Sequence, residues 1–323
     1  MKKFFKILRT VLVILLIVAA ALFAVIKISG AHRSDPADVN LYETSNPFIV
    51  GRTENIAHRC GAGLAPEESL LAMQTCLTNE NIAVDIFEFD LRLTADGQAV
   101  LFHDATLDRC TDAAEVLGST EIAVRDVTLE ELQKLNMGEN FTDSEGNRPY
   151  ADAQLQVLTL SEALDCLTSA GVTRLSIEVK DAGEAGMQAT DLLYAELAER
   201  DLLASTVYSS FKTDVSAYAQ ETYPDLIRSN TDAEAISFYL AAITNNPDYV
   251  PPCSVFQLPF TDKYLNMGVN FGTAQVINYA HSHNIAIHYW TVNDADRMAY
   301  LASIRADGIM SDYPDLLSET LRR

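Results

Sequence analysis

From residue 54 onward, short apolar runs alternate with longer segments that read as helices. The runs predicted to form strands lie at 54–58, 84–91, 99–103, 174–180, 205–211, 226–230, 253–258, 285–291 and 308–311. The segments predicted to form helices lie at 128–135, 184–199, 212–221, 232–243, 272–283 and 294–303. Strands that alternate with helices along a chain predict a parallel sheet covered by helices.

Two further helices are predicted from the residues that open them. Residues 66–69 (Pro-Glu-Glu-Ser) place a proline and two acids where the first turn of a helix accommodates them, and this helix is expected to run to about Asn79. The sequence from Thr159 to Glu162 opens another helix, which is expected to end near Gly171.

One connection is too short to join parallel strands. Only a few residues around Asp96-Gly97 separate the runs 84–91 and 99–103, whereas a parallel crossover needs about a dozen residues or more. Because Asp-Gly favours a hairpin turn, this pair is predicted to be antiparallel. The remaining strands predict an α/β fold of the (β/α)8 TIM-barrel class, whose active sites lie at the C-terminal mouth. We expect the hairpin to fold His103 back over that mouth.

Residues 105–155 form the least regular part of the barrel region. We interpret them as an insertion that forms a lid over the mouth and determines which head group fits. The alternative interpretation is a solvated loop that packs against the side of the barrel.

The N-terminus carries a different pattern. An uncharged apolar run at 10–26 follows the basic residues Lys2, Lys3, Lys6 and Arg9. Its length lies near the lower end of the roughly 17 to 25 residues of a transmembrane helix, and the basic flank favours a cytoplasmic N-terminus. We therefore predict a single-pass cell-membrane anchor within residues 1–30, a linker at 31–52 and one extracytoplasmic barrel domain at 53–323. Secretion after cleavage at residues 29–31 is the alternative.

The charge of the chain restricts its partners. A formal net charge of -22 argues against nucleic-acid binding, which depends on clustered lysines and arginines. Any phosphate site must therefore create its own positive potential from metal, Arg and Lys. The five cysteines show no CxxC spacing, which favours free thiols, although one bridge from Cys60 to Cys76 or Cys110 remains open.

Candidate chemistry is concentrated between residues 56 and 104. Glu88 and Asp90 are two positions apart in a predicted strand, so both side chains share a face and can converge on one point. Two converging carboxylates need a cation, and an all-oxygen ligand set favours Ca²⁺ or Mg²⁺ over Zn²⁺. His58 and His103 are then available to move protons.

Eight short motifs appear along the chain in the order typical of one enzyme family. They are Ile56-Ala-His-Arg59, Pro66-Glu-Glu-Ser69, Phe87-Glu-Phe-Asp-Leu91, Thr94-x-Asp-Gly97, Phe102-His-Asp104, Ile177-Glu-Val-Lys180, Trp290-Thr-Val-Asn293 and Ser311-Asp-Tyr-Pro314. In these motifs the chain resembles the glycerophosphodiester phosphodiesterase family over about residues 53 to 318. The resemblance implies a (β/α)8 barrel and divalent-metal-dependent hydrolysis of glycerophosphodiesters to glycerol 3-phosphate and an alcohol.

The resemblance also assigns roles to individual residues. It makes His58 and His103 the acid/base pair, and it adds Glu178 to Glu88 and Asp90 as metal ligands. By the same resemblance, Arg59 and Lys180 contact the phosphate and Trp290 forms a wall of the substrate pocket. The implied substrate is a small glycerophosphodiester or a glycerophosphate polymer.

Several positions depart from the family pattern or remain open. Cys60 stands where the family has glycine, and Glu68 adds an acid that either weakens phosphate binding or faces solvent. We expect Asp312 to be structural, and His281 and His283 to face solvent on a helix. The rival functions are a phospholipase D-like or phosphatidylinositol-specific phospholipase C-like enzyme, and a non-catalytic module that binds glycerophosphoryl groups.

Overall fold

The computed structural model describes residues 34–260 and 269–322, together with residues 5, 8–14, 16, 17, 20, 21 and 24. The predicted membrane span at 10–26 lies partly outside these residues. Within the described part of the chain, no helix combines the length and the apolar character needed to cross a bilayer. The anchor therefore stays a prediction.

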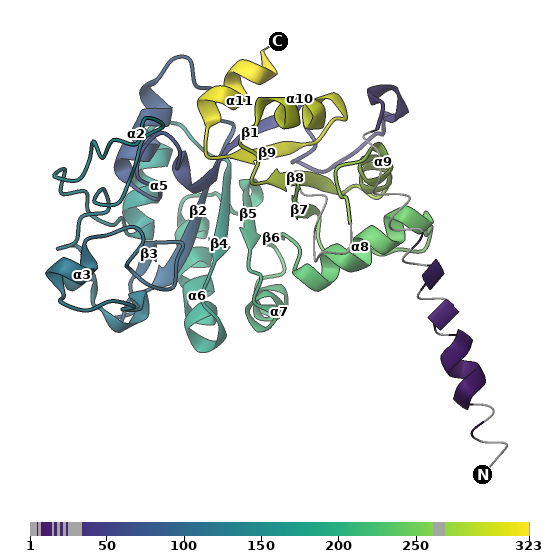
Figure 1. The fold of residues 1–323 in the computed structure, drawn as a ribbon, viewed down its shortest axis with the longest axis horizontal. Coiled ribbons are helices and arrows are strands. Elements are labelled where there is room, and N and C mark those ends of the chain that lie inside the picture. Colours follow the sequence, from purple (N-terminus) through teal and green to yellow (C-terminus); the bar gives the residue numbers. More distant parts are fainter. Residues whose placement is uncertain are drawn as a thin grey trace.

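Eight parallel strands form the barrel (Figure 1). They are β1 (Glu54–Ala57), β2 (Ile86–Leu93), β4 (Leu175–Val179), β5 (Thr206–Ser209), β6 (Ile227–Arg228), β7 (Val255–Pro259), β8 (Ala286–Trp290) and β9 (Gly308–Ser311). Their order around the ring is β6-β5-β4-β2-β1-β9-β8-β7, and a parallel bridge between Ser229 and Val255 joins its two ends. The (β/α)8 class is confirmed.

The predicted hairpin is also confirmed. Strand β3 (Ala99–Leu101) pairs antiparallel with β2, with Leu91 opposite Leu101 and Leu93 opposite Ala99. The turn between them contains Gly97 at φ +75°, a left-handed conformation that glycine adopts without strain. The hairpin extends β2 beyond the barrel and returns the chain to the mouth at His103.

The helices surround the sheet in Figure 1. They are α2 (Leu70–Thr78), α5 (Leu160–Ser169), α6 (Gly183–Glu199), α7 (Thr213–Thr222), α8 (Asp232–Thr244), α9 (Ala274–Ser282), α10 (Ala295–Ser303) and α11 (Pro314–Leu321). Thr159 starts α5 as predicted, because its hydroxyl accepts from the Glu162 amide while the Glu162 carboxylate accepts from the Thr159 amide. Helix α11 was not among the predicted segments.

Helix α2 begins four residues later than predicted. Ser69 is its N-cap and accepts a hydrogen bond from the amide of Ala72 at 3.1 Å. Glu68 precedes this cap in a left-handed conformation, with φ +60°. The stretch from Pro66 to Ser69 is therefore a turn that leads into the helix.

At the N-terminal end of the strands, opposite the mouth, apolar side chains fill the inside of the barrel. This cluster consists of Phe48, Ile56, Ile86, Val207, Val255, Ala286 and Met310. Phe48 comes from the segment before the first strand, at residues 34–50, which we call the N-terminal strap. Asn46 of the strap donates to the backbone oxygens of Ser254 and Asn284, which lie one and two residues before the starts of β7 and β8. The strap thus lies across the N-terminal end of the barrel, opposite the mouth.

The insertion at 105–155 has an apolar core of its own. Its buried residues include Leu107, Cys110, Ala113, Val124, Val127, Leu132, Leu135 and Met137, and they pack against Val100 and Phe102 of the hairpin. The insertion contains the short helices α3 (Ala113–Val116) and α4 (Leu129–Leu132) and lies beside β3 in Figure 1. It is an ordered unit attached next to the mouth.

Candidate active site

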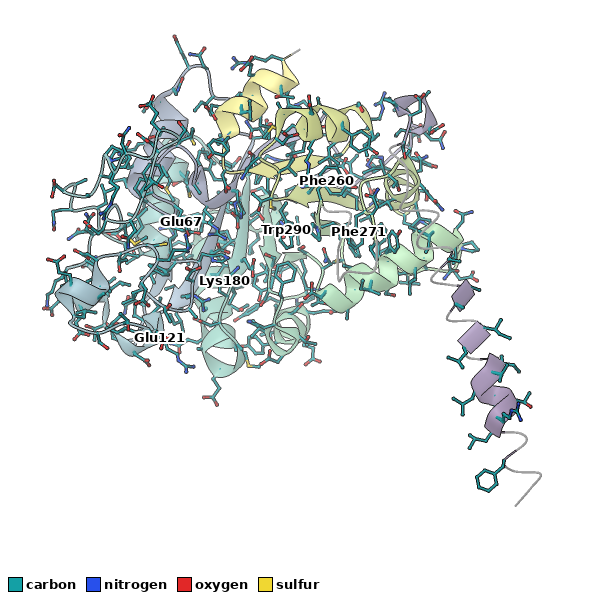
Figure 2. All side chains as sticks on the ribbon, in the orientation of Figure 1. Glu67, Glu121, Lys180, Phe260, Phe271 and Trp290 are labelled. Atoms are coloured by element: carbon teal, nitrogen blue, oxygen red, sulfur yellow. The ribbon has the colours of Figure 1, made fainter. Side chains whose placement is uncertain are left out.

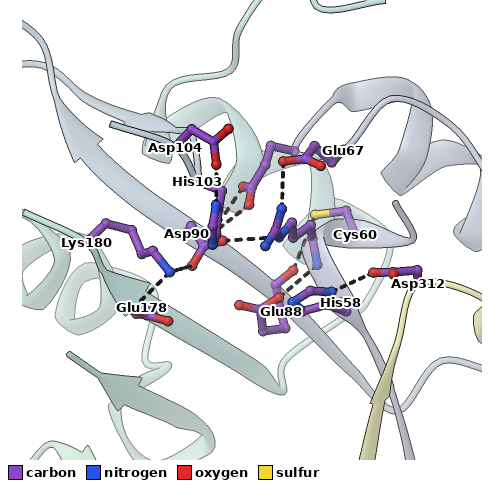
Figure 3. A network of polar contacts seen from close by, with 12 residues as sticks. His58, Cys60, Glu67, Glu88, Asp90, His103, Asp104, Glu178, Lys180 and Asp312 are labelled. Atoms are coloured by element: carbon purple, nitrogen blue, oxygen red, sulfur yellow. Dashed lines mark hydrogen bonds and ion pairs between the residues drawn. The ribbon is translucent and has the colours of Figure 1, made fainter. Parts of the chain in front are cut away.

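All eight side chains predicted to act in the site line one cavity of about 240 Å³ at the mouth. They are His58, Arg59, Glu88, Asp90, His103, Glu178, Lys180 and Trp290. Figure 2 shows Lys180 and Trp290 near the centre of the molecule, and Figure 3 shows how the polar members of this group face one another. Residues separated by more than 200 positions meet here because parallel strands end on the same side of the barrel.

The strands β2 and β4 aim the carboxylates at a common point. Asp90 lies opposite Glu178 in the parallel pairing, and Glu88 is two residues before Asp90 on the same face of β2. All three carboxylates line the cavity, and Asp90 is 1% exposed. The three carboxylates therefore face the same cavity.

A lysine ammonium group lies between two of these carboxylates. The Nζ atom of Lys180 is 3.1 Å from Oε1 of Glu178 and 3.4 Å from Oδ1 of Asp90 (Figure 3). The other oxygen of Asp90, Oδ2, is buried and makes no hydrogen bond among the described residues, although the Nε atom of Arg59 lies 3.7 Å away as an ion-pair partner. As the side chains stand, no three Cys, His, Asp or Glu residues in the described part of the chain form a set that could hold a metal ion.

The carboxylates carry more negative charge than their neighbours neutralise. Burial raises the pKa of Glu88 and of Glu178 to about 7, and the negative charge of Asp90 adds to both shifts. Burial alone would also raise the pKa of Asp90, but the positive charge of Lys180 and of other neighbours lowers it overall. An additional positive charge close to Glu88 and Glu178 would therefore stabilise the ionised forms of both carboxyls.

The carboxylate of Asp312 holds the imidazole ring of His58 in place. Its Nδ1 atom lies 2.6 Å from Oδ1 of Asp312, which follows β9. The other carboxylate oxygen of Asp312 accepts a hydrogen bond from Asn293 at 2.6 Å. Burial lowers the pKa of His58, but the hydrogen bond to Asp312 and the charge of Glu88 together raise it above its ordinary value. His58 is thus set to hold a proton.

The pKa of His103 is shifted in the opposite direction from that of His58. Its Nδ1 atom lies 2.6 Å from Oδ1 of Asp104, and Arg109 of the insertion forms an ion pair with the same carboxylate. Burial lowers the pKa of His103. The negative charge of Asp90 opposes this shift, but the positive charges of Lys180 and Arg59 add to the lowering, and the pKa stays below its ordinary value. One histidine thus favours the protonated form and the other the neutral form, which is the arrangement that general acid–base catalysis needs.

Arg59 is positioned by backbone and side-chain contacts. It adopts φ +47° in the short 3₁₀ turn His58–Cys60 that follows β1, and its amide donates to Oε2 of Glu88 at 2.8 Å. Its guanidinium donates to Glu67 at 3.0 Å. Cys60 is also left-handed, with φ +64°, a conformation that glycine adopts more readily.

Residues 58–316 match the model of the glycerophosphoryl diester phosphodiesterase family. The chain belongs to this family. A glycerophosphodiester phosphodiesterase of Bacillus subtilis is 27% identical over 296 residues, which cover 86% of this chain and 89% of the relative. The human glycerophosphodiester phosphodiesterase 1 is 32% identical over 181 residues, which cover 56% of this chain and 49% of the human protein.

Solved structures share the fold. A glycerophosphodiester phosphodiesterase from Agrobacterium tumefaciens has a TM-score of 0.62 at 23% identity, covering 83% of this chain and 99% of the other. An Oleispira antarctica phosphodiesterase in complex with the product sn-glycerol-3-phosphate has a TM-score of 0.64 at 20% identity, covering 85% and 99%. As a member of the family, this phosphodiesterase hydrolyses glycerophosphodiesters to glycerol 3-phosphate and an alcohol.

Several functional contacts of this phosphodiesterase were missed or misjudged in the sequence. Asp312, expected to be structural, contacts a proposed catalytic histidine; its place directly after a barrel strand was the available signal. Phe211 lies edge-on to Trp290, with 5.8 Å between ring centroids, and lines the same cavity. Arg109 donates to both carboxylate oxygens of Glu67, at 2.6 and 2.8 Å.

Glu68 does not face solvent, which was one of the two expectations for it. It is 1% exposed, and its carboxylate oxygens lie 3.2 Å from the amide of Asp90. Burial and the neighbouring carboxylates Asp90 and Glu88 raise the pKa of Glu68 well above its ordinary value. This contact explains why the chain turns at Glu68 and delays the start of α2.

The prediction for His281 was wrong. It is 8% exposed, and its Nε2 atom lies 3.0 Å from Oδ2 of Asp307. His283 caps the end of α9 and contacts the backbone oxygen of Tyr279 at 2.8 Å. The open question about a disulfide is answered for the five cysteines, all of which are free.

Proposed function

We propose that this phosphodiesterase requires a divalent cation, Ca²⁺ or Mg²⁺, held by Glu88, Asp90 and Glu178. The donors are carboxylate oxygens, which suit hard cations. A cation near Asp90 would satisfy its buried Oδ2 atom and offset the repulsion that raises the pKa values of Glu88 and Glu178. A cation there would replace Lys180 as the partner of Asp90 and Glu178, and Lys180 would then be available to bind the phosphate.

The observation that best supports this function is that His58 and His103 line the same cavity and that their pKa values are shifted in opposite directions. The attacking oxygen forms the new bond to phosphorus, and the neutral His103 accepts its proton. The protonated His58 gives its proton to the oxygen of the leaving alcohol as the phosphorus–oxygen bond breaks. Arg59 and Lys180 bind the phosphate oxygens and hold the phosphorus between the two histidines. A bound divalent cation supplies a Lewis acid that neutralises phosphate charge.

The apolar side of the cavity suits the glycerol part of the substrate. Phe211 and Trp290 line the cavity together and form this side. Their rings exclude water from the phosphate and present a flat surface to the carbon chain of glycerol. This assigns Trp290 to substrate binding.

We further propose that the enzyme is anchored at the cell membrane with its barrel on the extracytoplasmic side. The support is the basic flank followed by the apolar run at 10–26. Deletion of residues 1–30 tests this, because the truncated protein should leave the membrane fraction. External protease should cleave the barrel of the full chain in intact spheroplasts; protection there would contradict the orientation.

The reaction is tested by release of glycerol 3-phosphate from glycerophosphocholine and glycerophosphoethanolamine. The full chain in detergent should turn over both substrates with Ca²⁺ or Mg²⁺ and neither with chelator. His58→Gln should lower kcat by about 10² to 10⁴, and His283→Gln, a histidine away from the cavity, serves as the matched control. Turnover that persists in chelator would reject the metal, and substrate binding without turnover would favour the non-catalytic module.

A further inference from the structure

A second cavity of about 480 Å³ opens beside the catalytic one. The two cavities share the side chains His58 and Arg59 and the residue Thr291. The rest of the second cavity is built from the turn after β1, from the insertion and from the segments after β8 and β9. The insertion contributes Arg109, Cys110, Met137, Asn140, Phe141 and Thr142. A space of this size next to the catalytic groups can hold a part of the substrate.

The positions of His58 and His103 indicate which part of the substrate the second cavity holds. His103 lines the catalytic cavity, whereas His58 lines both cavities. A phosphodiester held at Arg59 has two ester arms, and the arm that receives the proton of His58 must lie next to His58. If His58 protonates the leaving oxygen, the leaving alcohol extends into the second cavity while glycerol 3-phosphate stays in the first.

The charged groups of the second cavity are already paired with one another. Glu67 accepts hydrogen bonds from Arg59 and Arg109, and Asp312 contacts His58. Neither carboxylate is therefore available to pair with a cationic head group. Arg109 itself is half exposed at this wall and repels a positive charge. A quaternary ammonium group is disfavoured here.

The remaining polar groups suit hydroxyls. Asn140 donates its amide hydrogens to the backbone oxygens of Asp108 and Thr111, at 3.0 and 2.8 Å, which leaves its carbonyl oxygen as an acceptor. Thr142 and Tyr313 add hydroxyl groups to the lining. These groups can exchange hydrogen bonds with an alcohol that carries several hydroxyls of its own.

We propose that the second cavity binds the alcohol half of the diester and selects an uncharged polyol, such as glycerol or inositol, over choline. Thr142 and Tyr313 are the specificity-determining residues. The inference rests on the proposed function of His58 as the acid. It gives the insertion a role in choosing the substrate.

The test compares kcat/KM for three diesters of glycerol phosphate, with the full chain in detergent and saturating Ca²⁺. The alcohols are glycerol, choline and methanol, and the methyl ester carries no hydroxyl or charge that the second cavity could recognise. The wild type should prefer the glycerol diester to the choline diester by about tenfold. In Thr142→Val/Tyr313→Phe, the ratio of kcat/KM for the glycerol diester to that for the methyl diester should fall about tenfold, as expected for the loss of two neutral hydrogen bonds.

The controls separate the possible failures. Thr120→Val changes an exposed threonine of the insertion outside the cavity and should leave the ratio unchanged. Thr142→Val alone, also at an exposed position, should lower the ratio about threefold and guards against misfolding of the double variant. If the wild type hydrolyses none of the diesters, the proposed function itself fails. If it hydrolyses all three but prefers choline, or if the ratio does not change in the variants, only the assignment of the second cavity is overturned.

Discussion

The Nδ1 atom of His58 and the Oδ1 atom of Asp312 lie 2.6 Å apart, although 254 positions separate the two residues in the chain. The contact joins the end of the first barrel strand to the end of the last. It fixes the imidazole ring and directs its other nitrogen toward the cavity. It also stabilises the positive charge of protonated His58.

Asp312→Asn should therefore change the pH profile as well as the rate. Asp312 raises the pKa of His58, so its replacement should lower that pKa. Activity that needs protonated His58 is lost as pH rises through this pKa, so the alkaline limb of kcat/KM should move to lower pH. We expect kcat to fall about ten- to hundredfold. Asp315→Asn, at an exposed position nearby, is the control; an unmoved alkaline limb would contradict the role of Asp312.

Arg109→Gln should weaken catalysis from outside the barrel. Arg109 connects Glu67, which positions Arg59, to Asp104, which positions His103. The substitution removes the positive charge that pairs with both carboxylates. We expect kcat/KM to fall at least tenfold for every diester, since the change affects catalytic groups. Arg125→Gln, an exposed arginine of the insertion, should have no effect; equal losses in both variants would mean that the insertion is merely destabilised.

The barrel could be predicted from the sequence because its signals are local. Apolar runs and the Asp96-Gly97 turn depend on neighbouring residues, so the strands lie within a few residues of their predicted bounds. The same holds for the proposed site residues, since parallel strands bring their C-terminal ends together whatever the loops do.

The missed features depend on contacts between distant residues. Glu68 turns inward because the amide of Asp90, 22 positions away, donates to it. His281 is buried because Asp307 lies opposite it, and a helical position alone does not reveal such a partner. The link from Arg109 to Glu67 spans 42 positions and starts in the least regular part of the chain. No short-range pattern carries this information.

Binding of Ca²⁺ should stabilise the fold measurably. A cation that offsets the repulsion among Glu88, Asp90 and Glu178 binds the folded state alone, so at a concentration of 100 Kd it contributes about 2.7 kcal/mol. Thermal unfolding followed by circular dichroism should therefore show a higher Tm in Ca²⁺ than in chelator. Glu178→Gln should remove most of this difference, whereas Glu199→Gln, exposed on α6, should keep it. The same Tm with and without Ca²⁺ in the wild type would reject the site.

Phe48→Ala should destabilise the protein although Phe48 precedes the barrel. Its ring is fully buried, lies edge-on to His288 at 5.9 Å and sits under the guanidinium of Arg174 at 4.8 Å. Removal of a buried phenylalanine ring leaves a cavity and costs about 3 to 5 kcal/mol. Urea unfolding should show this loss, while Leu41→Ala, 78% exposed on the strap, should change stability by less than about 0.5 kcal/mol. A small effect of Phe48→Ala would mean that the strap is not part of the folded core.

Glu54 is the first residue of β1, at the end of the barrel opposite the mouth, and should make the free energy of unfolding depend on pH. Burial raises its pKa to about 7, against the opposing charge of Arg174. The folded state then binds a proton more tightly than the unfolded state, so the free energy of unfolding should fall as pH rises from about 4.5 to 7. The full shift is worth about 3 kcal/mol, and screening by water at the strand end reduces it to about 2 kcal/mol. Urea unfolding of the wild type and of Glu54→Gln in chelator should differ by this amount more at pH 8 than at pH 5, in favour of the variant. Because Glu88 and Glu178 titrate in both proteins, only Glu54 can produce the difference, and parallel pH curves would show that its carboxyl remains ionised in the fold.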